Sequence, residues 1–327
     1  LTTNALKTLI LPKYSQQLSV RDPIEVAKQY IPEIRKKSDV LIALTHIGIQ
    51  SNDSAHQKPS AFPDDIRLAK ENPEIDFVIG GHSHTLLREG VTEGNTLIAQ
   101  AGEKGAYIGK VTAQWDSKGK KVLNKKAEVV AIIPSRGEDA ALKKKLDVYV
   151  TKSKKVFDKV LGKSEVFLDG KRETTRRKES NLGNLICDAL RSATKSDVAF
   201  FNGGGIRDSI EKGEIRFRDI LKAFPFRNRV TTLKLTGAQL RRTLEEGVLN
   251  SEQTGSLLQV SGISYEIKNG KLGTVTLSGK ALDESRSYKI STNDFVATGG
   301  DGFTALLEAK DTASYEDRTI DQVLAAY

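Results

Sequence analysis

Two short apolar runs near the start of the chain, each preceded by a helical pattern, restrict the fold more than any other feature. Residues 39–44 and 75–79 are mostly continuous apolar stretches, which is typical of strands buried on both faces. Residues 24–37, interrupted by Pro32, and residues 65–71 carry helical patterns. Further strands are predicted at residues 96–100, 109–115 and 128–133. Alternating helices and strands, followed by strands alone, predict a layered α/β (α+β) sheet covered by helices.

A long lysine-rich helix is predicted over residues 138–160. Its apolar residues form only a narrow stripe: Leu142, Leu146, Tyr149, Val156 and Val160. A helix that is polar around most of its circumference can bridge two domains. We therefore predict a first domain at residues 1–135, a linker helix at 136–162 and a second domain at 163–327.

Histidines follow both apolar runs. His46 comes just after the first run, and His82 and His84 come just after the second, next to glycines. Sites in open α/β sheets form where strands end and loops begin. The neutral imidazole of histidine is also the side chain that most often binds metal ions in proteins. The three histidines are therefore candidate metal ligands. The alternative from the residues alone is that they are hydrogen-bonded structural side chains.

Composition narrows the function classes. The 327 residues are 38% hydrophobic with a mean hydropathy of −0.38, and no apolar run approaches the roughly 18 residues that a membrane span needs. Much of the net charge of +9 lies in lysines of the long helix, where a solvated face explains it. Nucleic-acid binding is not predicted, because no aromatic stacking platform accompanies the charge. The single Cys187 lies in an apolar run and is predicted to be a core residue.

Five segments resemble known families. Residues 38–48 (S-D-V-L-I-A-L-T-H-I-G) and 79–85 (I-G-G-H-S-H-T) resemble the T-H-x-G and G-H-S-H segments of calcineurin-like metallophosphoesterases. Three later segments resemble the substrate domain of the 5′-nucleotidase family, which includes UDP-sugar hydrolases and 2′,3′-cyclic-nucleotide phosphodiesterases. They are E-S-N-L-G-N-L at 179–185, N-G-G-G-I-R at 202–207 and G-G-D-G-F at 299–303. The resemblance covers essentially the whole chain.

The resemblance implies a fold and a metal site. It implies a partial four-layer metallophosphoesterase β-sandwich flanked by helices, then a mixed α/β substrate-binding domain. Two divalent metal ions, Zn²⁺ or Mn²⁺, are implied, with His46 and His82 on one ion and His84 on the other. The family's remaining ligands and its transition-state histidine belong to motifs that this chain does not contain. The chain is therefore expected to carry half a metal site and to be inactive or poorly active alone, so the enzyme assignment is to the parent protein.

A basic cluster at residues 171–178 is the candidate phosphate site. Taken alone it reads as a solvated loop, but the resemblance implies that Arg176, Arg172 and, further on, Arg207 bind phosphate. Guanidinium groups suit phosphate because they donate two parallel charge-assisted hydrogen bonds. Asn202, at the start of the N-G-G-G-I-R segment, is also implied in substrate binding. The three glycines of that segment either turn main-chain N–H groups toward an anion or simply make a tight turn.

Two phenylalanines match the family's nucleobase clamp. The resemblance implies that Phe226 and Phe295 sandwich the base, with Asn228 at the base edge and Asp301 at the ribose hydroxyls. Stacking on aromatic rings tolerates any base, so broad base specificity is expected. The alternatives are core packing for the rings and a turn role for Asp301, and Phe200, Phe201 and Phe224 are predicted to be core residues.

The expected function is metal-dependent hydrolysis of an AMP-like nucleotide by a metal-activated water. Domain closure about the long helix is a further hypothesis, and export to the periplasm, cell wall or medium is implied by the resemblance alone. One alternative is a catalytically incomplete nucleotide-binding module. Another is a surface protein that binds acidic polymers through its positive face. The preferred nucleotide, the metal and the oligomeric state stay open.

Overall fold

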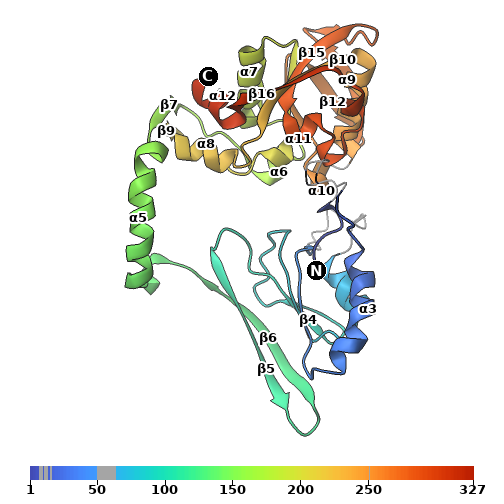
Figure 1. Ribbon diagram of the computed structural model, residues 1–327, viewed down its shortest axis with the longest axis vertical. Coiled ribbons are helices and arrows are strands. Elements are labelled where there is room, and N and C mark those ends of the chain that lie inside the picture. The colour runs from blue at the N-terminus through green and yellow to red at the C-terminus, as the bar shows by residue number, and fades with distance from the viewer. Residues whose placement is uncertain (7–9, 11–13, 15–16, 50–63, 250) are drawn as a thin grey trace. The chain divides into compact units, whose positions relative to one another are not determined.

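The computed structural model describes the chain except for residues 7–9, 11–13, 15–16, 50–63 and 250 (Figure 1). The described chain divides into two compact units. The first contains Gln17–Ala140 with the first six residues, and the second contains Ala141–Tyr327 with the described residues between 8 and 16. Among the described residues, no helix combines the length and apolar character that a membrane span requires.

The first unit is built on a four-stranded sheet in the order β1-β2-β4-β3. β1, β2 and β4 run parallel, and β3 is antiparallel to β4. The strands are β1 (Ile42–Leu44), β2 (Phe77–Ile79), β3 (Val91–Glu93) and β4 (Thr96–Ala99). On one face, Val78 and Ile98 pack in a core with Ile24 of α3 (Pro23–Arg35) and Leu68 of α4 (Asp65–Glu71).

The opposite face of this sheet is partly covered by a long hairpin (Figure 1), formed by β5 (Tyr107–Asp116) and β6 (Lys121–Ala131). Phe77 and Leu97 pack there with Ala127 of β6. The same face is open at β1, where Ile42 and Leu44 are 54% and 68% exposed. The first unit is thus an incomplete layered sheet, helices on one side and a hairpin over part of the other.

The predicted elements of this unit are present, and the ends of most of them are shifted. The helix predicted at 65–71 has those same bounds, and the strands of the predicted 109–115 and 128–133 regions are longer than expected. Pro32 does not interrupt α3. Because Pro32 lies on the exposed side of the helix, water can replace the hydrogen bond that its missing N–H removes. Asp22 caps the helix by accepting from the N–H of Ile24 at 2.8 Å.

The second unit contains a five-stranded mixed sheet in the order β11-β8-β15-β10-β16. β8 and β15 are parallel, and the other neighbouring pairs are antiparallel. The strands are β8 (Val198–Asn202), β10 (Arg229–Thr236), β11 (Leu258–Ser261), β15 (Ser287–Asn293) and β16 (Lys310–Thr319). This mixed sheet with its helices confirms the predicted α/β class.

Helices and a second, smaller sheet cover the two faces of this sheet. One face packs against α7 (Asn181–Thr194), α8 (Phe217–Ala223) and α12 (Ile320–Ala326). The other packs against α9 (Gly237–Leu249) and the sheet of β12 (Ser264–Lys268), β13 (Lys271–Leu277) and β14 (Lys280–Ala281). Adjacent residues of β8 point to opposite faces, so Phe200 and Phe201 join different cores. The predictions that Phe200, Phe201, Phe224 and Cys187 are buried are confirmed.

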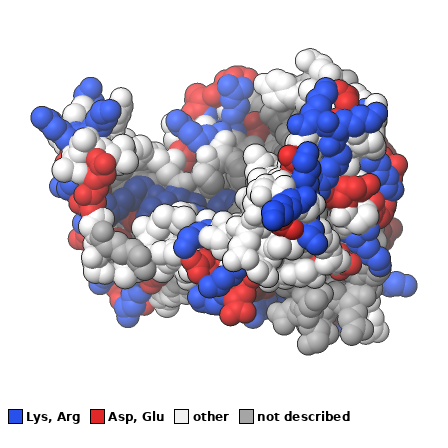
Figure 2. All heavy atoms as spheres, turned by 90° about the horizontal axis from the view of Figure 1, so that it is seen from below, with Lys and Arg blue, Asp and Glu red and all other residues white. Residues whose placement is uncertain are grey.

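The predicted long helix is α5 (Ala140–Phe157), drawn in green in Figure 1. None of its residues is buried, and its lysines are exposed as a solvated face requires. The division into units falls between Ala140 and Ala141, at its first turn; that α5 acts as a linker stays a prediction. On the face of the molecule shown in Figure 2, basic side chains are interspersed with acidic ones. The shorter elements are η1 (Pro134–Arg136), β7 (Val160–Ser164), α6 (Arg172–Thr175), η2 (Gly203–Gly205), β9 (Gly213–Arg216), α10 (Ser251–Thr254), α11 (Asp294–Ala297), η3 (Gly300–Gly302) and η4 (Ala305–Glu308).

Candidate functional site

The predicted metal ligands lie in the first unit, after strands β1 and β2. Because these strands are parallel neighbours, their carboxyl ends meet at one edge of the sheet. The rings of His46 and His82 lie there with centroids 5.0 Å apart and planes inclined by 65°. A Cβ on Gly81 would come within 3.2 Å of Nδ1 of His46, so the glycine allows the backbone after β2 to approach this ring.

His84 is arranged differently. Its Nδ1 lies 2.5 Å from Oε2 of Glu103, and both His82 (φ 79°) and His84 (φ 62°) adopt the left-handed backbone region that non-glycine residues rarely occupy. Among the residues the structure describes, no three His, Cys, Asp or Glu side chains gather closely enough to hold a metal ion. Two paired imidazoles are half of the about four ligands that a zinc site needs. The donor set therefore fits part of a metal site and is not a complete one.

Asp65 lies buried next to these strand ends. Its Oδ1 accepts a hydrogen bond of 2.6 Å from Oγ1 of Thr45, the residue before His46. Its Oδ2 has no hydrogen-bond partner among the described residues, and a Cβ on Gly80 would come within 2.3 Å of that oxygen. Burial raises the pKa of Asp65 to about 7, against the hydrogen bond from Thr45, which lowers it. No motif in the sequence marks Asp65, because an aspartate at the start of a helix is common for reasons of helix charge alone.

The predicted phosphate-binding arginines lie in the second unit. Arg176 follows α6, and its backbone N–H donates to the carbonyl of Arg172 at 3.2 Å, so the two side chains are one helical turn apart. Arg176 is only 8% exposed, whereas Arg172 and Arg207 are exposed. Burial, and then the charges of Arg172 and Arg207, lower the pKa of Arg176 to about 9, while Asp301 acts in the opposite direction. The guanidinium still carries its proton at neutral pH, so positive charge is concentrated at this point.

Glycines bring these elements together. A Cβ on Gly203 would lie 2.1 Å from the carbonyl oxygen of Thr175, and one on Gly255 would lie 2.6 Å from Cα of Gly204 and 3.3 Å from Cζ of Arg176. The N–H groups of Gly203 and Gly204 donate to backbone carbonyls at 2.8 Å each. The N–H groups of these two glycines are therefore already used within the fold, which argues against their facing an anion.

Asp301 belongs to the same cluster. It is 9% exposed, its φ is 55°, and Oδ2 accepts a 2.7 Å hydrogen bond from Nδ2 of Asn202. Burial raises the pKa of Asp301 to about 6, while the bond from Asn202 and the charges of Arg176 and Arg207 lower it. The structure thus brings together four of the predicted substrate residues: Asn202, Arg176, Arg207 and Asp301.

The two predicted clamp residues have different surroundings. Phe226 is 58% exposed, and Cζ of Arg207 lies 5.8 Å from its ring centroid. The half-buried ring of Phe295 rests on Gly300, where a Cβ would come within 2.5 Å of the ring. Neither ring contacts the other in the described structure. Asn228 connects their loops, because its Nδ2 donates to Oδ1 of Asp294, beside Phe295, at 2.8 Å.

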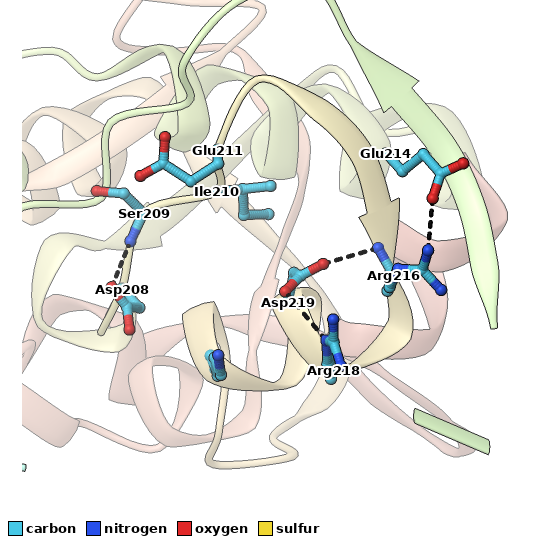
Figure 3. Close-up of a pocket in the computed structure, with 9 residues that line it drawn as sticks. Asp208, Ser209, Ile210, Glu211, Glu214, Arg216, Arg218 and Asp219 are labelled. Carbon is cyan, nitrogen blue, oxygen red and sulfur yellow. Dashed lines mark hydrogen bonds and ion pairs between the residues drawn. The ribbon is translucent and has the colours of Figure 1, made fainter. Parts of the chain in front are cut away.

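A polar pocket of about 360 Å³ lies elsewhere in the second unit (Figure 3), along β9 and α8. It holds none of the predicted site residues. Its arginines are occupied in ion pairs, Arg216 with Glu214 at 2.6 Å and Arg218 with Asp158 at 2.7 Å. The arginines of this pocket are thus paired with carboxylates, whereas Arg176 lies close to the charges of two further arginines.

The first unit thus has an incomplete layered sheet with two adjacent histidines, and the second has a mixed sheet with a cluster of arginines. Residues 160–308 match the family model described as the 5′-nucleotidase C-terminal domain. This part of the chain is therefore a 5′-nucleotidase C-terminal domain, and the chain as a whole corresponds to the C-terminal portion of the family's members. This confirms the family predicted from the sequence motifs.

Individual relatives agree with this assignment. Over 94% of its length the chain is 35% identical to the trifunctional nucleotide phosphoesterase protein YfkN of Bacillus subtilis, covering 22% of that protein. It is 29% identical to the 5′-nucleotidase of Vibrio cholerae, again over 94% of the chain, covering 62% of that protein. The crystal structure of a 5′-nucleotidase precursor from Thermus thermophilus superposes with a TM-score of 0.80 at 29% identity, covering 94% of this chain and 64% of that one. The chain therefore spans less than two thirds of these relatives.

Proposed function

We propose that the second unit binds a nucleoside phosphate, with the phosphate at Arg176 and the ribose at Asp301. The observation that carries the proposal is the burial of Arg176 beside two further arginines. A phosphate dianion at this point would interact favourably with the charges of all three guanidinium groups, and burial of Arg176 would strengthen that interaction. The 5′-nucleotidase relatives act, by their names, on phosphate esters of this kind.

The remaining predicted residues complete the proposed binding mode. Arg172 and Arg207 add charge-assisted hydrogen bonds to the phosphate, and Asn202 orients the carboxylate of Asp301. The base stacks between the rings of Phe226 and Phe295, each contributing about 1–3 kcal/mol. Asn228 has one amide hydrogen directed at Asp294, which leaves its second amide hydrogen for the edge of the base.

For the full-length protein we propose hydrolysis of nucleoside phosphates, including cyclic nucleotides or nucleotide sugars. His46, His82 and His84 would provide part of the ligands for two divalent ions, Zn²⁺ or Mn²⁺. Such ions polarise phosphoryl oxygens and lower the pKa of a bound water. Because the described residues pair only two imidazoles, we assign the activity to the full-length protein and expect this chain alone to be inactive. We propose an exported location on the family resemblance alone.

Phosphate release from AMP, ADP, cyclic AMP and a UDP-sugar tests the proposal, with Mn²⁺ or Zn²⁺ present. The full-length protein and this chain are compared, and calorimetry measures AMP binding to both. We expect that only the full-length protein releases phosphate, and that AMP binds both to the full-length protein and to this chain. Binding to both without turnover by either would replace the hydrolase with a nucleotide-binding module. No AMP binding by either protein would overturn the proposed function.

A further inference from the structure

The proposed nucleotide site is connected to a buried asparagine that the sequence motifs do not single out. Asn293 is the last residue of β15 and the N-cap of α11, the short helix that carries Phe295. It is 1% exposed. Its Oδ1 accepts from the backbone N–H of Val296 at 2.9 Å, and its Nδ2 donates to Oδ1 of Asn202 at 3.1 Å.

These hydrogen bonds form a continuous series in which each group donates to the next. The N–H of Val296 donates to Asn293, Asn293 donates to Asn202, and Asn202 donates to Asp301 at 2.7 Å. An amide side chain accepts through its oxygen and donates through its nitrogen. The backbone N–H of Val296 therefore fixes which way the amide of Asn293 faces. That orientation fixes Asn202 in turn, so that an N–H group, and not a carbonyl, meets the carboxylate of Asp301.

We infer that Asn293 is a positioning residue for the proposed nucleotide site. It holds the amide of Asn202 so that Asp301 presents its carboxylate to the ribose hydroxyls, and it caps the helix of Phe295. The inference rests on the proposed function, and deepens it by connecting the ribose-binding residue to the base-stacking helix. The side chains of Asn202 and Asn293 are both almost fully buried. A buried polar group without a hydrogen-bond partner lowers the stability of the folded protein.

Two substitutions separate the cap from the connection to Asn202. Asn293→Ser keeps an oxygen that can accept from Val296, but it is too short to reach Asn202. Asn293→Asp also keeps the cap and matches asparagine in size. It places a carboxylate oxygen, in the position of Nδ2 of Asn293, against the side chain of Asn202. Asn202 must then turn its amide, and its carbonyl meets Oδ2 of Asp301. Asp301 then retains a proton to higher pH, against the charges of Arg176 and Arg207 that face it.

The test compares binding of adenosine and 2′,3′-dideoxyadenosine to the chain by calorimetry between pH 5 and 8. The dideoxy compound has the same base but lacks the ribose hydroxyls. We expect the unchanged chain to prefer adenosine by about tenfold, the effect of one hydrogen bond to a charged group. Both variants should lose most of this preference while binding dideoxyadenosine within about twofold of the unchanged chain. In Asn293→Asp the pH midpoint of adenosine binding should also rise.

Asn269→Ser and Asn269→Asp, at an exposed turn, are the matched controls. If both Asn293 variants keep the full preference and the same pH midpoint, the inference is overturned. If they lose affinity for both nucleosides equally, the role is structural and the inference is equally wrong. Failure of the unchanged chain to bind either nucleoside would instead remove the proposed function, a separate result. Circular dichroism establishes whether each variant is folded. If the Asn293→Asp variant does not fold, the comparison of the two nucleosides with Asn293→Ser is sufficient to test the inference.

Discussion

At the scale of single residues, the nearly buried Arg176 lies where the charges of Arg172 and Arg207 also act, and this makes it the main candidate for phosphate binding. Arg176→Ala should weaken AMP binding by about 10- to 100-fold, since hydrogen bonds between charged groups contribute about 1.5–3 kcal/mol. Adenosine, which has no phosphate, should bind within about threefold of the unchanged chain. Calorimetry with both ligands measures the difference. The exposed neighbour Arg177→Ala is the control, and an equal loss for both ligands would contradict a phosphate role for Arg176.

Asp301 provides a pH-dependent prediction at the same scale. Its pKa is about 6 in the fold, above the ordinary value of 3.8. The folded state therefore binds the proton of Asp301 more tightly than the unfolded state does, and proton binding stabilises the fold. This stabilisation is fully present below about pH 4 and is lost as the pH rises toward 6. The loss is at most about 3 kcal/mol, from a shift of about two pKa units.

Asp301→Asn removes that titration. The unfolding free energy of the variant, minus that of the unchanged chain, should increase between pH 4 and 7. Urea unfolding of both proteins at unit pH steps measures this difference. Because all other carboxylates are common to both proteins, their contributions cancel. A difference that stays constant with pH would show that Asp301 titrates normally.

At the scale of elements, a buried ion cluster attaches the β5–β6 hairpin to its sheet. Oδ2 of Asp76 accepts from Nη2 of Arg35 at 2.7 Å and from the N–H of Leu41 at 2.8 Å, and Nζ of Lys125 on β6 lies 3.7 Å from Oδ1. Asp76 is 4% exposed, and burial lowers the pKa of Lys125. The carboxylate therefore neutralises a cation that the hairpin brings into the core.

Asp76→Asn should lower the unfolding free energy of the first unit by about 1–3 kcal/mol, because partly buried cations lose their counter-charge. Urea unfolding, monitored through hydrogen exchange of the backbone amides in the hairpin, measures the effect. Glu128→Gln on the same hairpin removes an exposed ion pair with Lys110 and should change stability by less than about 0.5 kcal/mol. Equal effects of the two substitutions would contradict the role of Asp76.

At the scale of the whole molecule, the two candidate sites lie in units that have separate cores. The double variant His46→Ala with His82→Ala should reduce Zn²⁺ binding, which we expect to be weak in this chain because two imidazoles are paired among the residues that the structure describes. AMP binding should stay within about twofold of the unchanged chain. Calorimetry with each ligand measures both. A parallel loss of AMP affinity would show that the histidines support the nucleotide site.

Local patterns in the sequence were sufficient for much of the fold. The bounds of α4 and the interior of α5 follow from apolar spacing and charge, since a helix depends on residues three and four apart. Histidines after two apolar runs indicated a site at the strand ends, and parallel pairing of β1 and β2 brings His46 and His82 together. The sequence could not show that His84 instead meets Glu103, because that contact depends on two left-handed backbone conformations.

The sequence by itself determined the family, the element types and the residue types available to bind phosphate, because these properties reside in motifs and short-range periodicity. Only the tertiary structure decided which arginine of the basic cluster is buried. It alone placed Asn202 beside Asp301, 99 positions away, and beside Asn293, 91 positions away. Burial and hydrogen-bond direction depend on such distant contacts, and no local pattern encodes them.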